Sequence, residues 1–397
     1  MSGMKHSGGS GSTRRVRKIK VAPMTRAVRI ALAASVVALG LGTGSPAFAA
    51  GGKAQLEASL PQMAMAVDPT PVVDLTVVSG GMGQAFILPP PEMLAISEYG
   101  PGDIVIDNAD PILENQTYDA VAIYAYSTGG NVDITNRSTG GLQALSSLGS
   151  AIGIYGYAAD GSVDISNEGG VFARSVYGLA DGIFASGSDV AVSNSGDITA
   201  VSVYGGWAAG IEAQATDLTT VQNDGSIYAS AAYGQAFGIY ATGGDVVVGN
   251  SGSIGAQGYY ATGIEAQSTG DVSVDNSGDI IAGSISTYYN PYTYGFYVYG
   301  SALATGINAG SNGEGAAVDV TNSGDISAVS YFGGAGISAI SSGQYGTASV
   351  TNSGNVYASQ YTKYGYGAYG IVTSADGDSS IDNSGGIDVV SAGAASG

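Results

Sequence analysis

Short runs in which apolar and polar residues alternate recur along most of this chain. Each run ends on an asparagine, which serves as a reference position for the repeat. Apolar residues stand four and two positions before this asparagine, a period of two that is typical of a β-strand. The pairs are Ile104/Ile106, Val132/Ile134, Val163/Ile165, Val190/Val192, Val246/Val248, Val272/Val274 and Val318/Val320.

The reference asparagines follow one another at nearly constant intervals. Successive intervals are 28, 31, 27, 29, 27, 26, 46, 30 and 31 residues. A constant interval of this size is the sequence signature of a repeat protein, and the one long interval predicts an insertion between Asn276 and Asn322. The ten positions are Asn108, Asn136, Asn167, Asn194, Asn223, Asn250, Asn276, Asn322, Asn352 and Asn383.

Two further apolar segments recur in most units. Ile or Val stands four positions after the asparagine and Ala six positions after it, as in Ile198/Ala200 and Ile280/Ala282. A third segment has the pattern GI-x-A and includes GIFA at 182–185 and GIEA at 210–213 and 263–266. Each unit therefore predicts three short strands, and the density of glycine argues against helices.

Three strands in every unit predict an all-β fold, a single-stranded parallel β-helix (solenoid) of about ten coils. In such a fold each strand pairs with its equivalent in the next coil, about 4.8 Å away. Small inward residues such as Ala200, Ala229 and Ala241 suit a narrow core. A sandwich of antiparallel hairpins is the alternative, but it would have to keep one three-strand register through ten units.

The segment VDNSGDIIA at residues 274–282 shows the corner that follows the first strand. Asn and Gly both tolerate left-handed backbone angles, so we expect such angles at this corner. Stacked coils place one asparagine above the next, which predicts a ladder of amide hydrogen bonds along the axis. The motif is therefore interpreted mainly as part of the scaffold.

The first 49 residues have the pattern of an export signal. Basic residues precede the apolar run at 30–42, and Ala47-Phe48-Ala49 is a small-residue cleavage site, so cleavage is expected after Ala49. A membrane anchor is the alternative for the apolar run. Residues 50–98 are irregular and rich in proline, and we interpret them as a linker or an N-terminal cap. Residues 99–397 form the repeat domain.

Charge is distributed unevenly along the chain. Eight of its 12 basic residues and its only histidine lie in the first 29 residues, which leaves 4 basic against 32 acidic residues, a net charge of −28. A chain of this charge repels phosphate backbones, so nucleic acid is not expected as a partner. The protein has no Cys, so an exported chain of this kind must be stabilised without disulfides.

The absence of His and Cys after residue 29 excludes several kinds of chemistry. Ser-His-Asp and Cys-His catalysis and His- or Cys-bound metals need residues that this part of the chain lacks. We expect no catalytic residues, no cofactor and no metal site. Two alternatives stay open: a carbohydrate-active enzyme that uses paired carboxylates, and a calcium ion shared by Asp279 and Asp325 of adjacent coils.

Aromatic residues interrupt the repeat within its one long interval. The segment YYNPYTYGFYVYG at 288–300 contains six Tyr and one Phe. Single tyrosines recur near the same corner in other units, and a stacked ladder and a binding surface are both compatible with them. We expect a projecting loop here that contacts a partner, because tyrosine gives large contacts at low entropic cost. The candidate residues are Tyr288, Tyr289, Tyr292, Tyr294, Phe296, Tyr297 and Tyr299.

The export signal followed by repeating GI-x-A and V-x-V-x-N-S-G-D-I-x-A motifs resembles the passenger domains of Gram-negative autotransporters (type V secretion). The resemblance covers residues 99–397 and implies a right-handed parallel β-helix, displayed at the outer membrane or released. It implies adhesion or cell–cell association, with cell-surface glycans, proteins or another copy as partner. It also implies a C-terminal outer-membrane β-barrel, whereas residues 391–397 are still repeat-like. We therefore expect the sequence to be an N-terminal fragment of such a protein.

Overall fold

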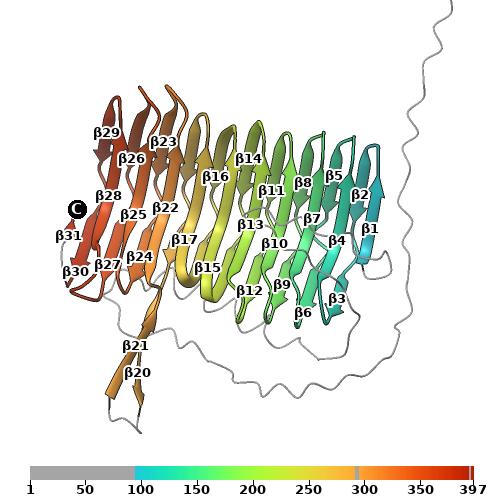
Figure 1. Ribbon diagram of the computed structural model, residues 1–397, viewed down its shortest axis with the longest axis horizontal. Helices are drawn as coiled ribbons and strands as arrows, with labels where there is room; N and C mark the ends of the chain where they lie inside the picture. The colour runs from blue at the N-terminus through green and yellow to red at the C-terminus, as the bar shows by residue number, and fades with distance from the viewer. Residues whose placement is uncertain (1–93, 291–294, 393–394) are drawn as a thin grey trace, which may run out of the picture.

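The chain winds into a parallel β-helix whose coils stack along one axis (Figure 1). The structure is a computed structural model that describes residues 94–290, 295–392 and 395–397. The predicted signal peptide, its cleavage site after Ala49, and all of the predicted linker before residue 94 lie outside the described residues. The first strand, β1, begins at Leu94 and pairs with the next coil, so residues 94–98 belong to the solenoid.

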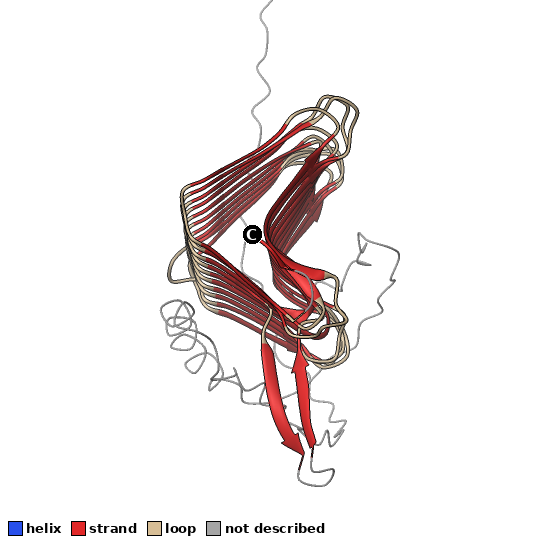
Figure 2. Cartoon of the chain, turned by 90° about the vertical axis from the view of Figure 1, so that its left-hand side faces the viewer, coloured by secondary structure: helices blue, strands red, loops and turns tan. Residues whose placement is uncertain are grey.

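Each coil contributes one strand to each of three faces, which surround the core when the rod is viewed along its axis (Figure 2). The first face is a ten-stranded sheet whose strands all end on a reference asparagine. Its strands are β2 (Ile104–Asn108), β5 (Val132–Asn136), β8 (Val163–Asn167), β11 (Val190–Asn194), β14 (Leu218–Asn223), β16 (Asp245–Asn250), β18 (Val272–Asn276), β23 (Ala317–Asn322), β26 (Thr347–Asn352) and β29 (Ser379–Asn383).

The second and third faces form one 19-stranded sheet, because two long strands, β15 (Ile227–Gly243) and β17 (Ile254–Ser268), continue through the corner between them. The second face also contains β3 (Ile112–Gln116), β6 (Leu142–Ser146), β9 (Val171–Ser175), β12 (Ile198–Ser202), β19 (Ile280–Ala282), β24 (Ile326–Ser330), β27 (Val356–Gln360) and β30 (Ile387–Ser391). The third face also contains β1 (Leu94–Gly100), β4 (Ala120–Ser127), β7 (Ala151–Ala158), β10 (Ala180–Gly187), β13 (Trp207–Ala215), β22 (Leu303–Ser311), β25 (Gly333–Ser341), β28 (Gly367–Ala375) and β31 (Ala395–Ser396).

Every strand of the three faces pairs in parallel with its equivalent in the next coil. Across the long interval β18 still pairs with β23, with Asn276 opposite Asn322. The register is therefore kept although 46 residues separate the two asparagines. These pairings confirm the parallel β-helix of about ten coils and rule out the sandwich of antiparallel hairpins.

The core is formed by the apolar positions that the repeat pattern marks. On the first face buried and exposed residues alternate, as the period of two predicts. The predicted small inward residues Ala200, Ala229 and Ala241 are fully buried. In the GI-x-A segment, a Cβ on Gly210 would lie 2.2 Å from Cγ2 of Ile227. Glycine is needed there because a β-branched side chain from the second face fills the space.

The reference asparagines form the expected ladder. Each Nδ2 donates to Oδ1 of the asparagine in the next coil, over 2.6–2.8 Å, in nine consecutive hydrogen bonds from Asn108 to Asn383. Most of these amides also donate to the carbonyl two residues later, as Asn250 does to Gly252. The ladder satisfies buried polar groups that would otherwise destabilise the core.

The expectation of left-handed backbone angles at this corner is wrong. Neither the reference asparagines nor the glycines of the NSGD motifs have a positive φ. Glycine is required instead because successive coils approach closely: a Cβ on Gly252 would lie 1.9 Å from the carbonyl oxygen of Gly225, and one on Gly278 2.0 Å from that of Gly252. No side chain fits in this stack of corners.

Outward aspartates make hydrogen bonds between coils. At the corner between the third and first faces, Asp245 Oδ1 accepts the backbone N–H of Asp271 over 2.8 Å, and Asp271 Oδ1 accepts that of Ala317 over 2.8 Å. Asp279 and Asp325 act in the same way at the corner between the first and second faces: Asp279 accepts from Asp325 N over 3.3 Å, and Asp325 from Asn355 N over 3.0 Å. These contacts give the recurrent aspartates a structural role between successive coils.

The long interval contains an antiparallel hairpin of β20 (Ile285–Asn290) and β21 (Gly295–Gly300). It lies between β19 and β22 and projects from the corner between the second and third faces (Figure 2). Its base is closed by Ser301 N, which donates to Ser284 O over 2.9 Å. Within the described part of the chain, no helix is long and apolar enough to cross a membrane.

Candidate functional site

A row of exposed and half-buried tyrosines follows the corner between the second and third faces; we call it the tyrosine corner. On the N-terminal side of the hairpin, Tyr177, Tyr204 and Tyr233 stack with ring centroids 5.4 and 6.0 Å apart. The stacking arises because parallel, in-register coils place equivalent side chains at the coil spacing. Tyr259 ends this row, since its ring packs edge-on against Tyr260 at 4.9 Å.

The hairpin lies where this row is interrupted. Two backbone hydrogen bonds tie its base to the coils on either side: Ala302 N donates to Tyr259 O over 2.7 Å, and Tyr331 N donates to Ser301 O over 2.7 Å. The tyrosine-rich insertion is therefore attached to the tyrosine corner itself.

Most of the residues predicted as a binding site lie on the two hairpin strands. Register pairs Tyr288 with Tyr297, Tyr289 with Phe296, and Ser286 with Tyr299. The other two candidates, Tyr292 and Tyr294, lie outside the described residues. The structure shows a paired hairpin where we expected a projecting loop. The pairing of its two strands determines which aromatic positions lie opposite one another.

The tyrosine corner continues on the C-terminal side of the hairpin. Tyr331 stacks on Tyr361 at 5.9 Å, and its ring also packs edge-on against Phe332. The segment between β27 and β28 adds Tyr364 and Tyr366, whose side chains are 81% and 79% exposed. The Nζ atom of Lys363 lies 4.9 Å from the ring centroid of Tyr364, so a cation accompanies the aromatic surface here.

A second group of side chains, on the outer side of the third face, was not predicted. Trp207 Nε1 donates to Asp181 Oδ1 over 3.2 Å and to Glu212 Oε2 over 3.1 Å. Gln214 Nε2 also donates to Glu212. The two carboxyl groups are only 2% and 7% exposed, and Phe237 packs against the indole ring at 4.7 Å. We call Asp181, Trp207 and Glu212 the acidic cluster.

Burial sets the protonation of this cluster. Desolvation raises the pKa of Asp181 well above its ordinary value, and the charge of the neighbouring Glu212 raises it further. Desolvation also raises the pKa of Glu212, against the effect of the Trp207 and Gln214 hydrogen bonds. No basic side chain contributes to either shift, so the pair resists ionisation as the pH rises.

We expect the acidic cluster to make the protein less stable at alkaline pH. Both folded-state pKa values lie above the unfolded ones, so between the ordinary carboxyl range near 4 and the raised values the folded state holds protons that the unfolded state has released. Stability therefore falls as the pH rises through this window. Glu212→Gln removes the charge but also one of the two hydrogen bonds that the carboxyl group accepts, and this second loss is the same at every pH. Its effect on the free energy of unfolding should therefore be more favourable at pH 8 than at pH 4 by about 2 kcal/mol.

Urea unfolding at both pH values measures this difference, with the exposed Glu314→Gln as the matched control. If Glu212→Gln changes the free energy of unfolding equally at pH 4 and pH 8, the pKa of Glu212 is not raised and the prediction is wrong.

One signal in the sequence could have revealed the acidic cluster. Glu212 occupies the variable position x of the GI-x-A motif, and the sheet register aligns these variable positions in one outward row. The row begins with aromatic residues that stack at 5.0 Å and then becomes polar. Its members are Tyr124, Tyr155, Phe184, Glu212, Tyr240, Glu265, Asn308 and Ser338.

No metal site is evident in the part of the chain that the structure describes. Groups of three or more His, Cys, Asp or Glu side chains that could hold an ion do not occur there. The pairing of Asp181 with Glu212 contributes only two carboxyl groups, and both already accept a hydrogen bond from Trp207.

Comparison with known proteins agrees with this architecture. A family profile described as "BigA third pectate lyase-like domain" matches residues 122–363, more than half of the chain. No curated protein and no solved structure matches the chain significantly. The match supports the right-handed form of the parallel β-helix, and BigA is a bacterial surface protein. The chain therefore belongs to the family of BigA third pectate lyase-like domains.

Proposed function

We propose that this protein is an exported β-helical protein of the bacterial surface that mediates adhesion or cell–cell association through its tyrosine corner. The observation that carries the proposal is the hairpin β20–β21, which projects from the rod where the exposed tyrosines are interrupted. The hairpin is not needed to build the solenoid, because the coils on either side of it pair directly with each other.

The chemistry of the tyrosine corner suits contact with another macromolecule. Tyrosine side chains combine a large apolar ring with a hydroxyl group and lose little conformational entropy on binding. Exposed rings lie both before and after the hairpin, as at Tyr233, Tyr361 and Tyr364. A series of weak contacts along one edge of a rod gives avidity without a strong single site.

The charge of the rod sets conditions for association. The chain after residue 29 has 4 basic and 32 acidic residues and a net charge of −28. Two copies therefore repel each other at low ionic strength, and salt screens this repulsion. Self-association through the tyrosine corner should strengthen as salt is added, which distinguishes it from pairing between opposite charges.

The export pattern at the N-terminus supports delivery outside the cytoplasm. The resemblance to autotransporter passengers supports display at the outer membrane or release from it. Cell-surface glycans, proteins or a second copy of the chain are the partners that this surface could contact.

A carbohydrate-active enzyme is a second candidate, favoured by the paired carboxyl groups of Asp181 and Glu212 and their raised pKa values. Glycoside hydrolysis uses two carboxyl groups of this kind. Both groups, however, are buried and already bonded to Trp207. Release of reducing ends from a polysaccharide, lost on Asp181→Asn, would favour the enzyme over the adhesin.

Replacing the exposed tyrosines beside the hairpin should weaken association. We expect the triple variant Tyr361→Ser, Tyr364→Ser and Tyr366→Ser to slow aggregation of beads coated with the full chain by about tenfold, because several aromatic contacts are lost. The measurement is the turbidity of the bead suspension at 150 mM salt.

The matched control is Tyr345→Ser, since Tyr345 is 67% exposed but lies between β25 and β26, at another corner. Aggregation that slows equally in the control, or that persists in the triple variant, would contradict a role of the tyrosine corner.

A further inference from the structure

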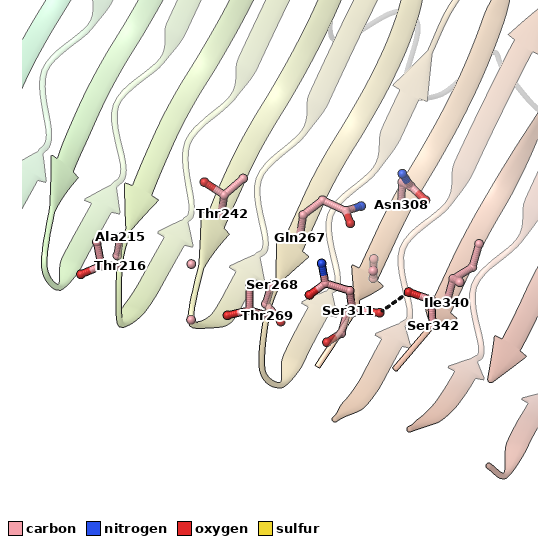
Figure 3. Close-up of a pocket in the computed structure, with 15 residues that line it drawn as sticks. Ala215, Thr216, Thr242, Gln267, Ser268, Thr269, Asn308, Ser311, Ile340 and Ser342 are labelled. Atoms are coloured by element: carbon pink, nitrogen blue, oxygen red, sulfur yellow. Dashed lines mark hydrogen bonds between the residues drawn. The ribbon is translucent and has the colours of Figure 1, made fainter. Parts of the chain in front are cut away.

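A groove runs along the edge of the third face that is opposite the tyrosine corner. It has a volume of about 670 Å³ and crosses the ends of β13, β15, β17, β22 and β25. Figure 3 shows Thr242, Gln267 and Asn308 on three consecutive strands, with Ser311 and Ser342 beside them. We call this site, lined by these five side chains and Ile340, the amide groove.

The amides of the groove are held in place by a carboxyl group. Gln267 Nε2 and Asn308 Nδ2 both donate to Glu265 Oε1, over 2.8 and 2.9 Å. Among the described residues neither Gln267 Oε1 nor Asn308 Oδ1 receives a hydrogen bond. Two fixed carbonyl oxygens therefore remain as acceptors for an external donor.

The lining of the groove is uncharged. Its described residues are Gly, Ala, Ser, Thr, Asn, Gln and Ile. Ser and Thr hydroxyls supply both donors and acceptors, and the amide oxygens supply acceptors at neighbouring coils. This pattern of polar groups suits a ligand that carries hydroxyl groups at regular intervals along an extended chain.

An aromatic side chain lies beside the groove, two residues before Thr242 on β15. Tyr240 is the neighbour of Glu265 in the sheet register. The face of the Tyr240 ring offers a surface for the C–H groups of a sugar, while the amide oxygens of the groove accept hydrogen bonds from the hydroxyl groups of the sugar. The coil spacing of about 4.8 Å is close to the length of one sugar residue.

Two other ligand classes fit the groove less well. An acidic glycan would meet no Lys or Arg among the described lining residues and would be repelled by the charge of the rod. An extended peptide binds to sheets mainly by adding a strand to a free edge. The backbone of β17 and β22 is already paired on both sides.

We propose that the amide groove binds a neutral glycan, extended parallel to the rod axis, with about one sugar residue for each coil. This inference does not rest on the adhesion proposal, because the groove and the tyrosine corner lie at opposite edges of the third face. Glu265 acts as a positioning residue that orients the amides of Gln267 and Asn308.

Calorimetric titration of the full chain tests the proposal directly. The neutral probes are cellohexaose, laminarihexaose, maltohexaose and mannohexaose, and hexagalacturonate is the acidic comparison. At least one neutral hexasaccharide should bind saturably with a Kd roughly between 10 µM and 1 mM. The double variant Gln267→Ala and Asn308→Ala should weaken this binding about tenfold or more.

The matched control is Gln222→Ala, an exposed glutamine on the first face, which should bind as the unmodified protein does. The proposal is overturned if no neutral probe binds, if hexagalacturonate binds most tightly, or if the control loses as much affinity as the double variant.

A measurement on the unmodified protein covers the case in which the double variant does not fold. In hydroxyl-radical footprinting, the bound hexasaccharide should reduce the oxidation of Ile340, which lines the groove. The oxidation of Tyr364 at the tyrosine corner should not change. Protection of Tyr364 without protection of Ile340 would place the glycan elsewhere and overturn the proposal.

Discussion

Replacing Asn250 with alanine should lower the free energy of unfolding by about 3–5 kcal/mol. Its Nδ2 atom donates to Asn276 Oδ1 over 2.7 Å and to Gly252 O over 2.8 Å, and its Oδ1 accepts from Asn223 over 2.7 Å. Alanine leaves all three partners without this bond in a place where water cannot replace it, since the Asn250 side chain is 2% exposed. Each unsatisfied buried group costs about 1–3 kcal/mol.

Urea unfolding of the full chain, followed by circular dichroism, measures this loss. Asn312→Ala serves as the matched control, because Asn312 is exposed and outside the ladder. Its expected change is within about 0.5 kcal/mol. If both variants unfold at the same urea concentration, the ladder contributes little and the stability of the rod must come from elsewhere.

Removal of the hairpin should have the largest effect on function. Deleting residues 285–300 takes away β20 and β21 and with them all the residues of the predicted binding site. The ends that remain are already adjacent, since Ser301 N donates to Ser284 O over 2.9 Å. The solenoid can therefore close without them, and we expect association between copies to be lost.

Neighbouring coils show that the shortened corner is compatible with the fold. Only Tyr331 and Phe332 separate β24 from β25, whereas four residues would remain between β19 and β22. The asparagine ladder and the strand pairing set the register of the coils on either side. Both continue across the insertion, from Asn276 to Asn322 and from β18 to β23. The deletion should therefore change the free energy of unfolding by no more than about 1 kcal/mol.

Sequence periodicity was sufficient to predict the scaffold because each coil repeats the same local pattern. The positions of Val272, Val274 and Asn276 relative to their equivalents predicted the strands, the corners and the amide ladder, all of which the structure contains. The reason for the glycine at the corner could not be predicted in the same way. It depends on the distance from Gly252 to Gly225 in the preceding coil, which is a property of stacking and not of local pattern.

The candidate site was predicted less completely. The interruption of the repeat pointed to the hairpin region, but composition alone did not predict that this segment would pair as β20 and β21. The acidic cluster was missed because Asp181 and Glu212 look like ordinary outward residues of two separate units. Only the register between β10 and β13 brings them to the indole of Trp207.

The most direct test of the proposed function compares the deletion of residues 285–300 with the unmodified chain in two measurements on the same samples. Aggregation of coated beads at 150 mM salt should be lost, while the urea unfolding transition should stay in place. This result would show that the repeat builds the rod and that the hairpin mediates association. Aggregation that persists in the folded deletion variant would contradict the proposed function, because association would then not depend on the projecting hairpin.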